Sequence, residues 1–246
     1  MKLRICHLYP DLMNLYGDRG NILAVMQRCH WRGIEADVTV ISLGKKPDFR
    51  LFDIIFMGGG QDSEQRTIAA DLQHEKGESI RKAVEDGVTV LAICGGYQLF
   101  GQSCATADGQ ELPGIGVFDA CTFPGKGRLI GNVVVESFMG DNGDTLVGFE
   151  NHGGRTYLGP DTEPIGRVII GGGNNGEDNL EGGRYLNAYG TYLHGSLLPK
   201  NPRFADRLIE AALTRRYGRA ELIPLDDTLE HIAHSAAIKL AKQTGR

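Results

Sequence analysis

The stretch Val88-Thr-Val-Leu-Ala-Ile-Cys94-Gly-Gly-Tyr-Gln-Leu-Phe100 decides how this chain folds. Its first six residues are apolar or β-branched, which predicts a strand buried on both faces of a sheet. Two glycines follow Cys94 before a helix-forming run, so the chain turns sharply from strand to helix there. Such a turn holds a nucleophile above the edge of a sheet, at a helix N-terminus that favours the thiolate. A buried structural cysteine is the alternative, but it would need no glycine pair, and we predict that Cys94 is a nucleophile.

The first half of the chain alternates between strand-like and helix-like segments. Further strands are predicted at 3–8, 36–41 and 52–56, and helices at 20–31, after Asp62 and at 79–85. Asp62 and Gln65 have the spacing of a capping box at a helix start. Strand–helix–strand alternation predicts an α/β fold with a mainly parallel central sheet and flanking helices.

The second half is richer in glycine and turn signals. Short strands are predicted at 133–135, 145–149 and 168–170, as an antiparallel extension on the same sheet, so that residues 1–246 form one domain. Two helices then close the chain, the first beginning at Asn201 and Pro202. The last, from about 228 to 242, carries an apolar stripe that we expect to pack on the sheet, with a subunit interface as the alternative; the stripe comprises Leu229, Ile232, Ala233, Ala236 and Leu240.

Composition excludes several classes of function. The 246 residues carry a formal net charge of −5 and a pI near 5.8, with none of the clustered cations that nucleic-acid or membrane-surface binding requires. No signal peptide and no membrane-spanning run is visible. Five cysteines without a C-x-x-C pair predict a cytoplasmic protein with reduced thiols and no zinc site.

A thiol nucleophile needs a base, and His194 has the most suitable setting among the seven histidines. It ends the apolar run Asn187-Ala-Tyr-Gly-Thr-Tyr-Leu-His194 and is followed by a glycine, which would place it at the edge of the sheet near Cys94. A core histidine satisfied by its neighbours is the alternative. His152, within Phe149-Glu-Asn-His-Gly-Gly-Arg-Thr156, is the rival base.

Another glycine-rich loop follows the strand predicted at 52–56, in Met57-Gly-Gly-Gly60-Gln61. The backbone N–H of Gly60, together with that of Gly95, could stabilise an oxyanion. A phosphate-binding loop is excluded because no Lys-Ser/Thr pair follows the glycines. The segment 171–176 matches a dinucleotide-binding fingerprint by letter, but no helix is predicted after it.

At this point the sequence resembles the class I glutamine amidotransferases, and within them the cobyric-acid-synthase-type branch. The resemblance rests on the Gly58–Gly60 loop, the Cys94 elbow and the late His194, together with the segments 9–22, 149–156 and 192–195. It implies a flavodoxin-like fold in which Cys94 forms a glutamyl thioester and His194 carries protons. It also implies that Arg128 anchors the glutamine carboxylate, a task that suits a guanidinium, and that Gln98 and His152 line the substrate site.

Within this branch, the chain is similar to glutaminase subunits of lipid II isoglutaminyl synthase. That resemblance implies a heterodimer with a MurT-like Mur ligase, which would hold ATP and Mg²⁺ and amidate the D-glutamate of lipid II, while this subunit holds no cofactor. The alternatives are the glutaminase of another synthase, of pyridoxal-phosphate or cobyrinate type, or a cysteine-dependent γ-glutamyl hydrolase or peptidase on the same fold.

One feature departs from the family pattern. Many class I members carry a glutamate two residues after the histidine, whereas Gly195 and Ser196 follow His194 here. Either this branch uses a dyad, or the orienting carboxylate comes from elsewhere. Our hypothesis at this point is that the partner subunit supplies it.

Overall fold

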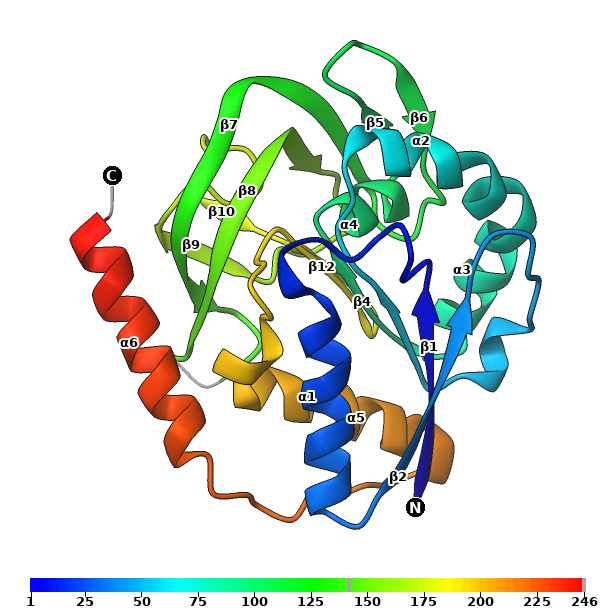
Figure 1. Ribbon diagram of the computed structural model, residues 1–246, viewed down its shortest axis with the longest axis vertical. Helices are drawn as coiled ribbons and strands as arrows, with labels where there is room; N and C mark the ends of the chain where they lie inside the picture. Colours follow the sequence, from blue (N-terminus) through cyan, green and yellow to red (C-terminus); the bar gives the residue numbers. More distant parts are fainter. Residues whose placement is uncertain (141–142, 245–246) are drawn as a thin grey trace.

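A computed structural model describes residues 1–140 and 143–244, and its central element is a six-stranded sheet (Figure 1). The strand order is β11-β12-β4-β3-β1-β2, and all neighbours are parallel except β11 and β12. Every residue of β3 and β4 is buried, as their continuous apolar runs predicted. The strands are β1 (Lys2–Leu8), β2 (Glu35–Ile41), β3 (Ile54–Met57), β4 (Thr89–Ile93), β11 (Gly183–Tyr185) and β12 (Ala188–Thr191).

Helices flank this sheet and confirm the α/β class. The β1–β2 and β3–β4 crossovers run in opposite directions along the sheet, so right-handed connections place their helices on opposite faces. α1 packs beside α5 on one of these faces (Figure 1). The helices are α1 (Arg19–Trp31), α2 (Asp62–Asp71), α3 (Gly77–Glu85), α4 (Gly95–Phe100), α5 (Pro202–Tyr217) and α6 (Thr228–Thr244).

The glycine-rich second half forms a sheet of its own, which corrects the expectation that it extends the first one. Only β11 adds an antiparallel strand to the central sheet. The second sheet runs β10-β9-β7-β5-β6 with β8 paired to β7, because β7 and β8 are long and pair mainly with each other. Its strands are β5 (Ser103–Ala105), β6 (Glu111–Pro113), β7 (Ala120–Ser137), β8 (Thr145–Leu158), β9 (Gly166–Ile170) and β10 (Leu180–Glu181).

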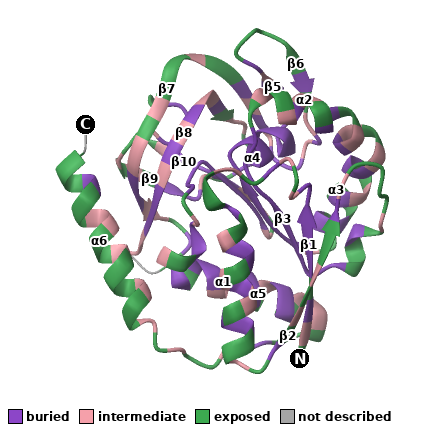
Figure 2. Ribbon diagram, viewed as in Figure 1, coloured by how far each residue is buried: buried purple, intermediate pink, exposed green. Residues whose placement is uncertain are grey.

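The last helix exists where the sequence predicted it, but the expectation for its packing face was wrong. All five residues of the predicted stripe are exposed, including Leu229 at 77% and Ile232 at 61%. The helix instead contacts the second sheet through Ala237, Ile238 and Ala241, and most of its surface faces solvent (Figure 2). Helical periodicity groups residues by face, but two neighbouring apolar faces on one helix cannot be ranked by periodicity alone.

The start of α2 also differs from the prediction by one residue. Gln61 is the N-cap, and the Glu64 carboxylate accepts a hydrogen bond from the Gln61 backbone N–H at 3.0 Å. Asp62 and Gln65 therefore do not form the capping box, and Gln65 is buried instead.

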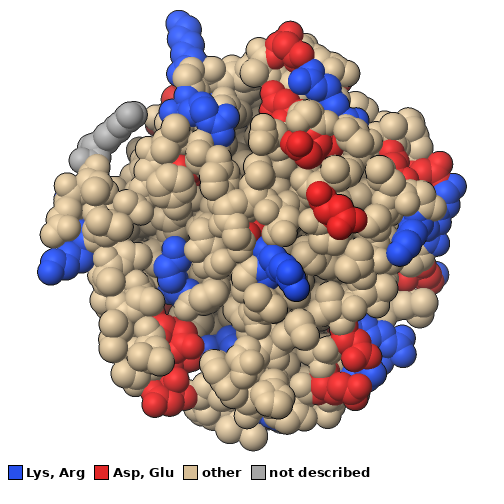
Figure 3. All heavy atoms as spheres, in the orientation of Figure 1, with Lys and Arg blue, Asp and Glu red and all other residues tan. Residues whose placement is uncertain are grey.

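The helices and the surface charges bear on the expectations from composition. Within residues 1–140 and 143–244, no helix is both long enough and apolar enough to cross a bilayer. On the face drawn in Figure 3, acidic and basic side chains are interspersed, in keeping with the modest net charge of −5.

Candidate active site

Cys94 stands between β4 and α4 in a strained backbone conformation. Its φ is 50° and its ψ is −107°, a backbone conformation that residues other than glycine rarely adopt. Gly96, two residues after Cys94, has no room for a side chain. A Cβ there would lie 2.8 Å from the Met57 carbonyl oxygen and 2.9 Å from that of Gly58. This geometry is that of a nucleophile elbow, as the sequence predicted.

His194 lies beside this elbow because β12 is the parallel neighbour of β4. The Cys94 backbone N–H donates to the Thr191 carbonyl oxygen at 2.8 Å, three residues before His194. The His194 backbone pairs with Phe149 of the second sheet, N to O at 2.8 Å, so the histidine stands where the two sheets meet. Its imidazole lies close to Cys94, since a Cβ at Gly59 would lie 2.7 Å from His194 Cε1 and 3.4 Å from Cys94 Cβ. Among the described residues, His194 Nε2 is buried without a hydrogen-bond partner, as expected of a catalytic base that awaits a proton donor.

The second ring nitrogen of His194 has an acidic partner within this chain. His194 Nδ1 lies 3.2 Å from Asp18 Oδ1, and both side chains are completely buried. The other carboxylate oxygen, Oδ2, accepts from the Gly59 backbone N–H at 2.8 Å, which orients the acid. The geometry is that of a Cys–His–Asp triad. Asp18 thus provides the orienting carboxylate, and the hypothesis that a partner subunit supplies it is wrong.

Asp18 was missed because nothing local marks it as catalytic. It lies immediately before α1, where an aspartate is ordinarily explained as a helix cap. Its side chain makes no capping bond there. The one feature of the sequence that could have pointed to Asp18 is its position within the segment 9–22, on which part of the family resemblance rests.

The electrostatics of the triad favour a protonated His194. Burial lowers the pKa of this imidazole, but the interaction with Cys94, the hydrogen bond to Asp18 and the charge of Asp18 raise it, to about 10 overall. The site therefore favours the imidazolium form of His194, which can give a proton to a leaving group.

The Gly58–Gly60 loop packs directly against Cys94 and His194. A Cβ at Gly59 would lie 2.7 Å from His194 Cε1, and one at Gly95 would lie 3.1 Å from the Gly60 nitrogen. The Gly59 N–H already serves Asp18, whereas Gly95 opens α4 and its N–H has no acceptor within the helix. Gly60 and Gly95 are therefore placed as neighbouring candidates for an oxyanion hole.

Gln98 and His152, the two further predicted substrate-binding residues, meet at the buried ring of Tyr192. Gln98 Nε2 donates to Tyr192 Oη at 3.0 Å, and Gln98 Oε1 accepts from Gln65 Nε2 at 3.1 Å. The His152 ring stacks on Tyr192 with centroids 3.6 Å apart. Burial lowers the pKa of His152, and the geometry favours His194 as the base, because His194 is the histidine paired with Asp18 beside Cys94. Contact of Gln98 and His152 with substrate stays a prediction.

Arg128 is exposed but is connected to the triad by two residues that the sequence did not single out. Its Nε donates to Asn151 Oδ1 at 2.8 Å and its Nη2 to the Asn151 carbonyl oxygen at 2.7 Å. Asn151 Nδ2 donates in turn to Tyr16 Oη at 2.7 Å, and the Tyr16 ring meets the His194 ring edge-on with centroids 5.0 Å apart. Arg128 thus lies at the rim of the site, and its role as the anchor of the glutamine carboxylate stays a prediction.

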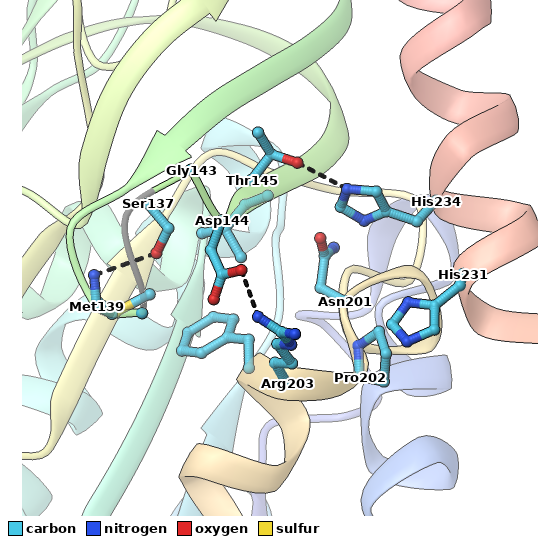
Figure 4. Close-up of a pocket in the computed structure, with 13 residues that line it drawn as sticks. Ser137, Met139, Gly143, Asp144, Thr145, Asn201, Pro202, Arg203, His231 and His234 are labelled. Atoms are coloured by element: carbon cyan, nitrogen blue, oxygen red, sulfur yellow. Dashed lines mark hydrogen bonds and ion pairs between the residues drawn. The ribbon is translucent and has the colours of Figure 1, made fainter. Parts of the chain in front are cut away.

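A separate cavity lies away from the triad, between α6, the start of α5 and the ends of β7 and β8 (Figure 4). There His234 Nε2 lies 2.8 Å from Thr145 Oγ1, and His234 Nδ1 lies 2.7 Å from the Lys200 carbonyl oxygen. These contacts fasten α6 to its neighbours. Neither Cys94 nor His194 lines this cavity, so it is not the site of the thiol chemistry.

Fold and triad are those of an enzyme with a cysteine nucleophile, and comparison with known proteins identifies its family. Residues 4–202 match the CobB/CobQ-like glutamine amidotransferase domain. The chain belongs to this family and is a glutamine amidotransferase.

Individual relatives show which members of this family the chain resembles. The chain is 43% identical, over 98% of its length and 97% of the relative's, to the lipid II isoglutaminyl synthase (glutamine-hydrolyzing) subunit GatD of Staphylococcus aureus. It is also 43% identical to the GatD subunit of Streptococcus pneumoniae, over 91% of this chain and 85% of that one. A probable cobyric acid synthase of Methanothermobacter thermautotrophicus is 32% identical, but the match covers 72% of this chain and only 37% of that protein.

Among solved structures, PurLQS from Thermotoga maritima superimposes with a TM-score of 0.63 at 18% identity, covering 87% of this chain and 99% of that one. The glutaminase domain of Trypanosoma brucei CTPS superimposes with a TM-score of 0.53 at 11% identity, covering 90% and 96%. At these identities the likeness concerns the fold alone.

Proposed function

We propose that this chain is the glutamine-hydrolysing subunit of a lipid II isoglutaminyl synthase. It would release ammonia from L-glutamine and deliver it to a MurT-like ligase, which uses ATP and Mg²⁺ to amidate the D-glutamate of the lipid II stem peptide to D-isoglutamine. The observation that carries the proposal is the 43% identity to a GatD subunit along nearly the whole of both chains, combined with the Cys94–His194–Asp18 geometry.

The mechanism follows from the triad. The Cys94 thiolate attacks the side-chain amide carbon of glutamine, and the N–H groups of Gly60 and Gly95 stabilise the resulting oxyanion. The His194 imidazolium gives its proton to the leaving nitrogen, the C–N bond breaks, and ammonia departs from a glutamyl thioester. His194 then takes a proton from water, which attacks the thioester and releases glutamate. Asp18 holds the imidazole in orientation throughout.

The lengths of the matching proteins favour a lipid II isoglutaminyl synthase over a synthase of cobyrinate type. The cobyric acid synthase relative is far longer than the region matched, so its glutaminase is one part of a larger chain. The GatD relatives match from end to end or nearly so. In our proposal the enzyme is a cytoplasmic heterodimer, and ATP, Mg²⁺ and lipid II are bound by the ligase subunit.

Transfer of labelled nitrogen tests both halves of the proposal. We expect the complex of this chain with its co-purified ligase, given ATP, lipid II and amide-¹⁵N-glutamine, to place ¹⁵N in the lipid II amide. The Cys94→Ser complex should lose this glutamine-dependent transfer but keep amidation when free ammonia is supplied. Labelled ammonia released without any transfer to lipid II would refute the synthase and leave the glutaminase standing, whereas full transfer by Cys94→Ser would refute the glutaminase.

A further inference from the structure

Glu181 is a buried acid that plays no part in the mechanism above. It ends β10, and none of its surface is exposed. Its Oε1 accepts two hydrogen bonds, from the Thr191 hydroxyl at 2.6 Å and from the Tyr192 backbone N–H at 2.8 Å. Burying a carboxyl group costs free energy unless the group is hydrogen-bonded. Both of these bonds go to two consecutive residues, Thr191 and Tyr192, which suggests a role for Glu181 in shaping that segment.

The two groups that Glu181 binds belong to the segment that joins the nucleophile to the base. The Thr191 carbonyl oxygen accepts the Cys94 backbone N–H at 2.8 Å. The Thr191 hydroxyl, which donates to Glu181, also accepts from the Leu193 backbone N–H at 3.1 Å. Glu181 therefore restrains three consecutive residues, 191 to 193, immediately before His194.

This segment leaves regular strand structure, which makes an external restraint necessary. β12 ends at Thr191, and between that strand and His194 the backbone no longer follows the ladder with β4. His194 itself is next fixed by its backbone pairing with Phe149. Without Glu181, the turn between those two anchors would lose two of the bonds that define its shape.

We propose that Glu181 is a positioning residue for glutamine hydrolysis: by clamping Thr191 and Tyr192, it keeps the His194 imidazole aligned between Cys94 and Asp18. Glu181 does not touch the reacting atoms, and its effect passes through the backbone of residues 191–193. The inference rests on the proposed glutaminase chemistry, which the Cys94→Ser test above examines separately.

The clamp depends on an acceptor oxygen and not on a charge. Burial raises the pKa of Glu181 to about 7, against the hydrogen bonds from Thr191 and Tyr192 that lower it, with the charge of Glu150 raising it further. Either protonation state offers an oxygen that can accept both bonds. A glutamine at this position keeps such an oxygen, whereas a methionine of similar length does not.

Paired substitutions in the full complex test the proposal. We expect Glu181→Met to lower kcat for glutamine about 100-fold, the cost of a catalytic group displaced by about 1 Å, with KM changed by less than about twofold. Glu181→Gln should keep kcat within about threefold of the wild type, because its amide oxygen can still accept both bonds. The pH profile of Cys94 alkylation by iodoacetamide should shift in Glu181→Met and not in Glu181→Gln, because it reports the Cys94–His194 pair.

A second variant and a control keep the test decisive if Glu181→Met fails to fold. Thr191→Val is nearly isosteric, removes only the hydroxyl, and should lower kcat about tenfold with KM unchanged. Asp53→Asn alters a buried carboxylate at the opposite end of the central strands, where it binds Arg216 and the Arg4 backbone N–H, and should lower Tm while kcat is kept. Wild-type kcat in Thr191→Val or in a folded Glu181→Met, or equal losses in Glu181→Gln and Glu181→Met, would overturn the proposal.

Discussion

Asp18 and His194 are 176 positions apart in the chain, yet their side chains meet at 3.2 Å and both are buried completely. At the scale of single residues, this contact decides how Cys94 is activated. An imidazole held by a carboxylate keeps the tautomer and the orientation that proton transfer requires. In the proposed mechanism the triad is therefore complete within one chain, since Asp18 supplies the acid.

Replacing the acid by its amide tests that role. We expect Asp18→Asn to lower kcat for glutamine by about 10²- to 10⁴-fold. An amide has only one acceptor oxygen, so if that oxygen keeps the bond from the Gly59 N–H, the NH₂ group faces His194 Nδ1 and favours the wrong tautomer of the imidazole. The charge of Asp18 raises the pKa of His194, so the variant should also show a lower His194 pKa in a pH titration of Cys94 alkylation.

Asp11→Asn is the matched control for this substitution. Asp11 lies in the same loop, is exposed and accepts only a 3.2 Å bond from the Ser42 hydroxyl, so its variant should keep both kcat and the pH profile. A fully active Asp18→Asn enzyme with an unaltered titration would show that Cys94 and His194 work as a dyad.

At the scale of elements, a partly buried ion-pair cluster joins α1, α5 and the segment before α6. The Arg28 guanidinium donates to Asp206 at 2.7 Å and to Asp227 at 2.6 Å, and its side chain is 3% exposed. α1 begins directly after Asp18, so the cluster holds in place the helix that follows the catalytic acid. Asp206 also accepts from Arg32 Nη2 at 2.7 Å, so removal of Arg28 leaves chiefly the Asp227 carboxylate uncompensated.

We expect Arg28→Ala to lower the free energy of unfolding by about 3 kcal/mol, measured by urea denaturation. Arg219→Ala is the control, since the Arg219–Glu221 pair is exposed on both sides, and it should change stability by less than about 0.5 kcal/mol. Equal stabilities of the two variants would mean that the cluster contributes nothing to the packing of α1 on α5.

Elements that are specified locally could be predicted from the sequence. The strand into Cys94, the glycine turn after it and the helices from Arg19, Gly77 and Pro202 match their predicted places, because apolar periodicity and turn residues act over a few positions. The packing of α6 could not be predicted in this way. Its Leu229 face and its Ala241 face are both apolar, and only the position of the second sheet selects between them.

At the scale of the whole molecule, the site is made by bringing four distant segments together. Cys94 follows β4, His194 follows β12, Asp18 precedes α1, and the Gly58–Gly60 loop follows β3. The placement of Cys94 and His194 at one edge of the sheet was predictable because each follows an apolar strand in a mainly parallel sheet, where carboxyl ends share an edge. Asp18 and the clamp by Glu181 were not, since their roles arise only from contacts across the fold.

Trapping the covalent intermediate tests the central claim most directly. The complex would be quenched with acid during steady-state turnover of glutamine, digested, and its peptides searched by mass spectrometry for a glutamyl thioester. We predict that the adduct is found on the peptide containing Cys94, and that Cys94→Ser yields neither adduct nor ammonia. An adduct on Cys6, Cys29, Cys104 or Cys121, or wild-type ammonia release by Cys94→Ser, would contradict the assignment of Cys94 as the nucleophile.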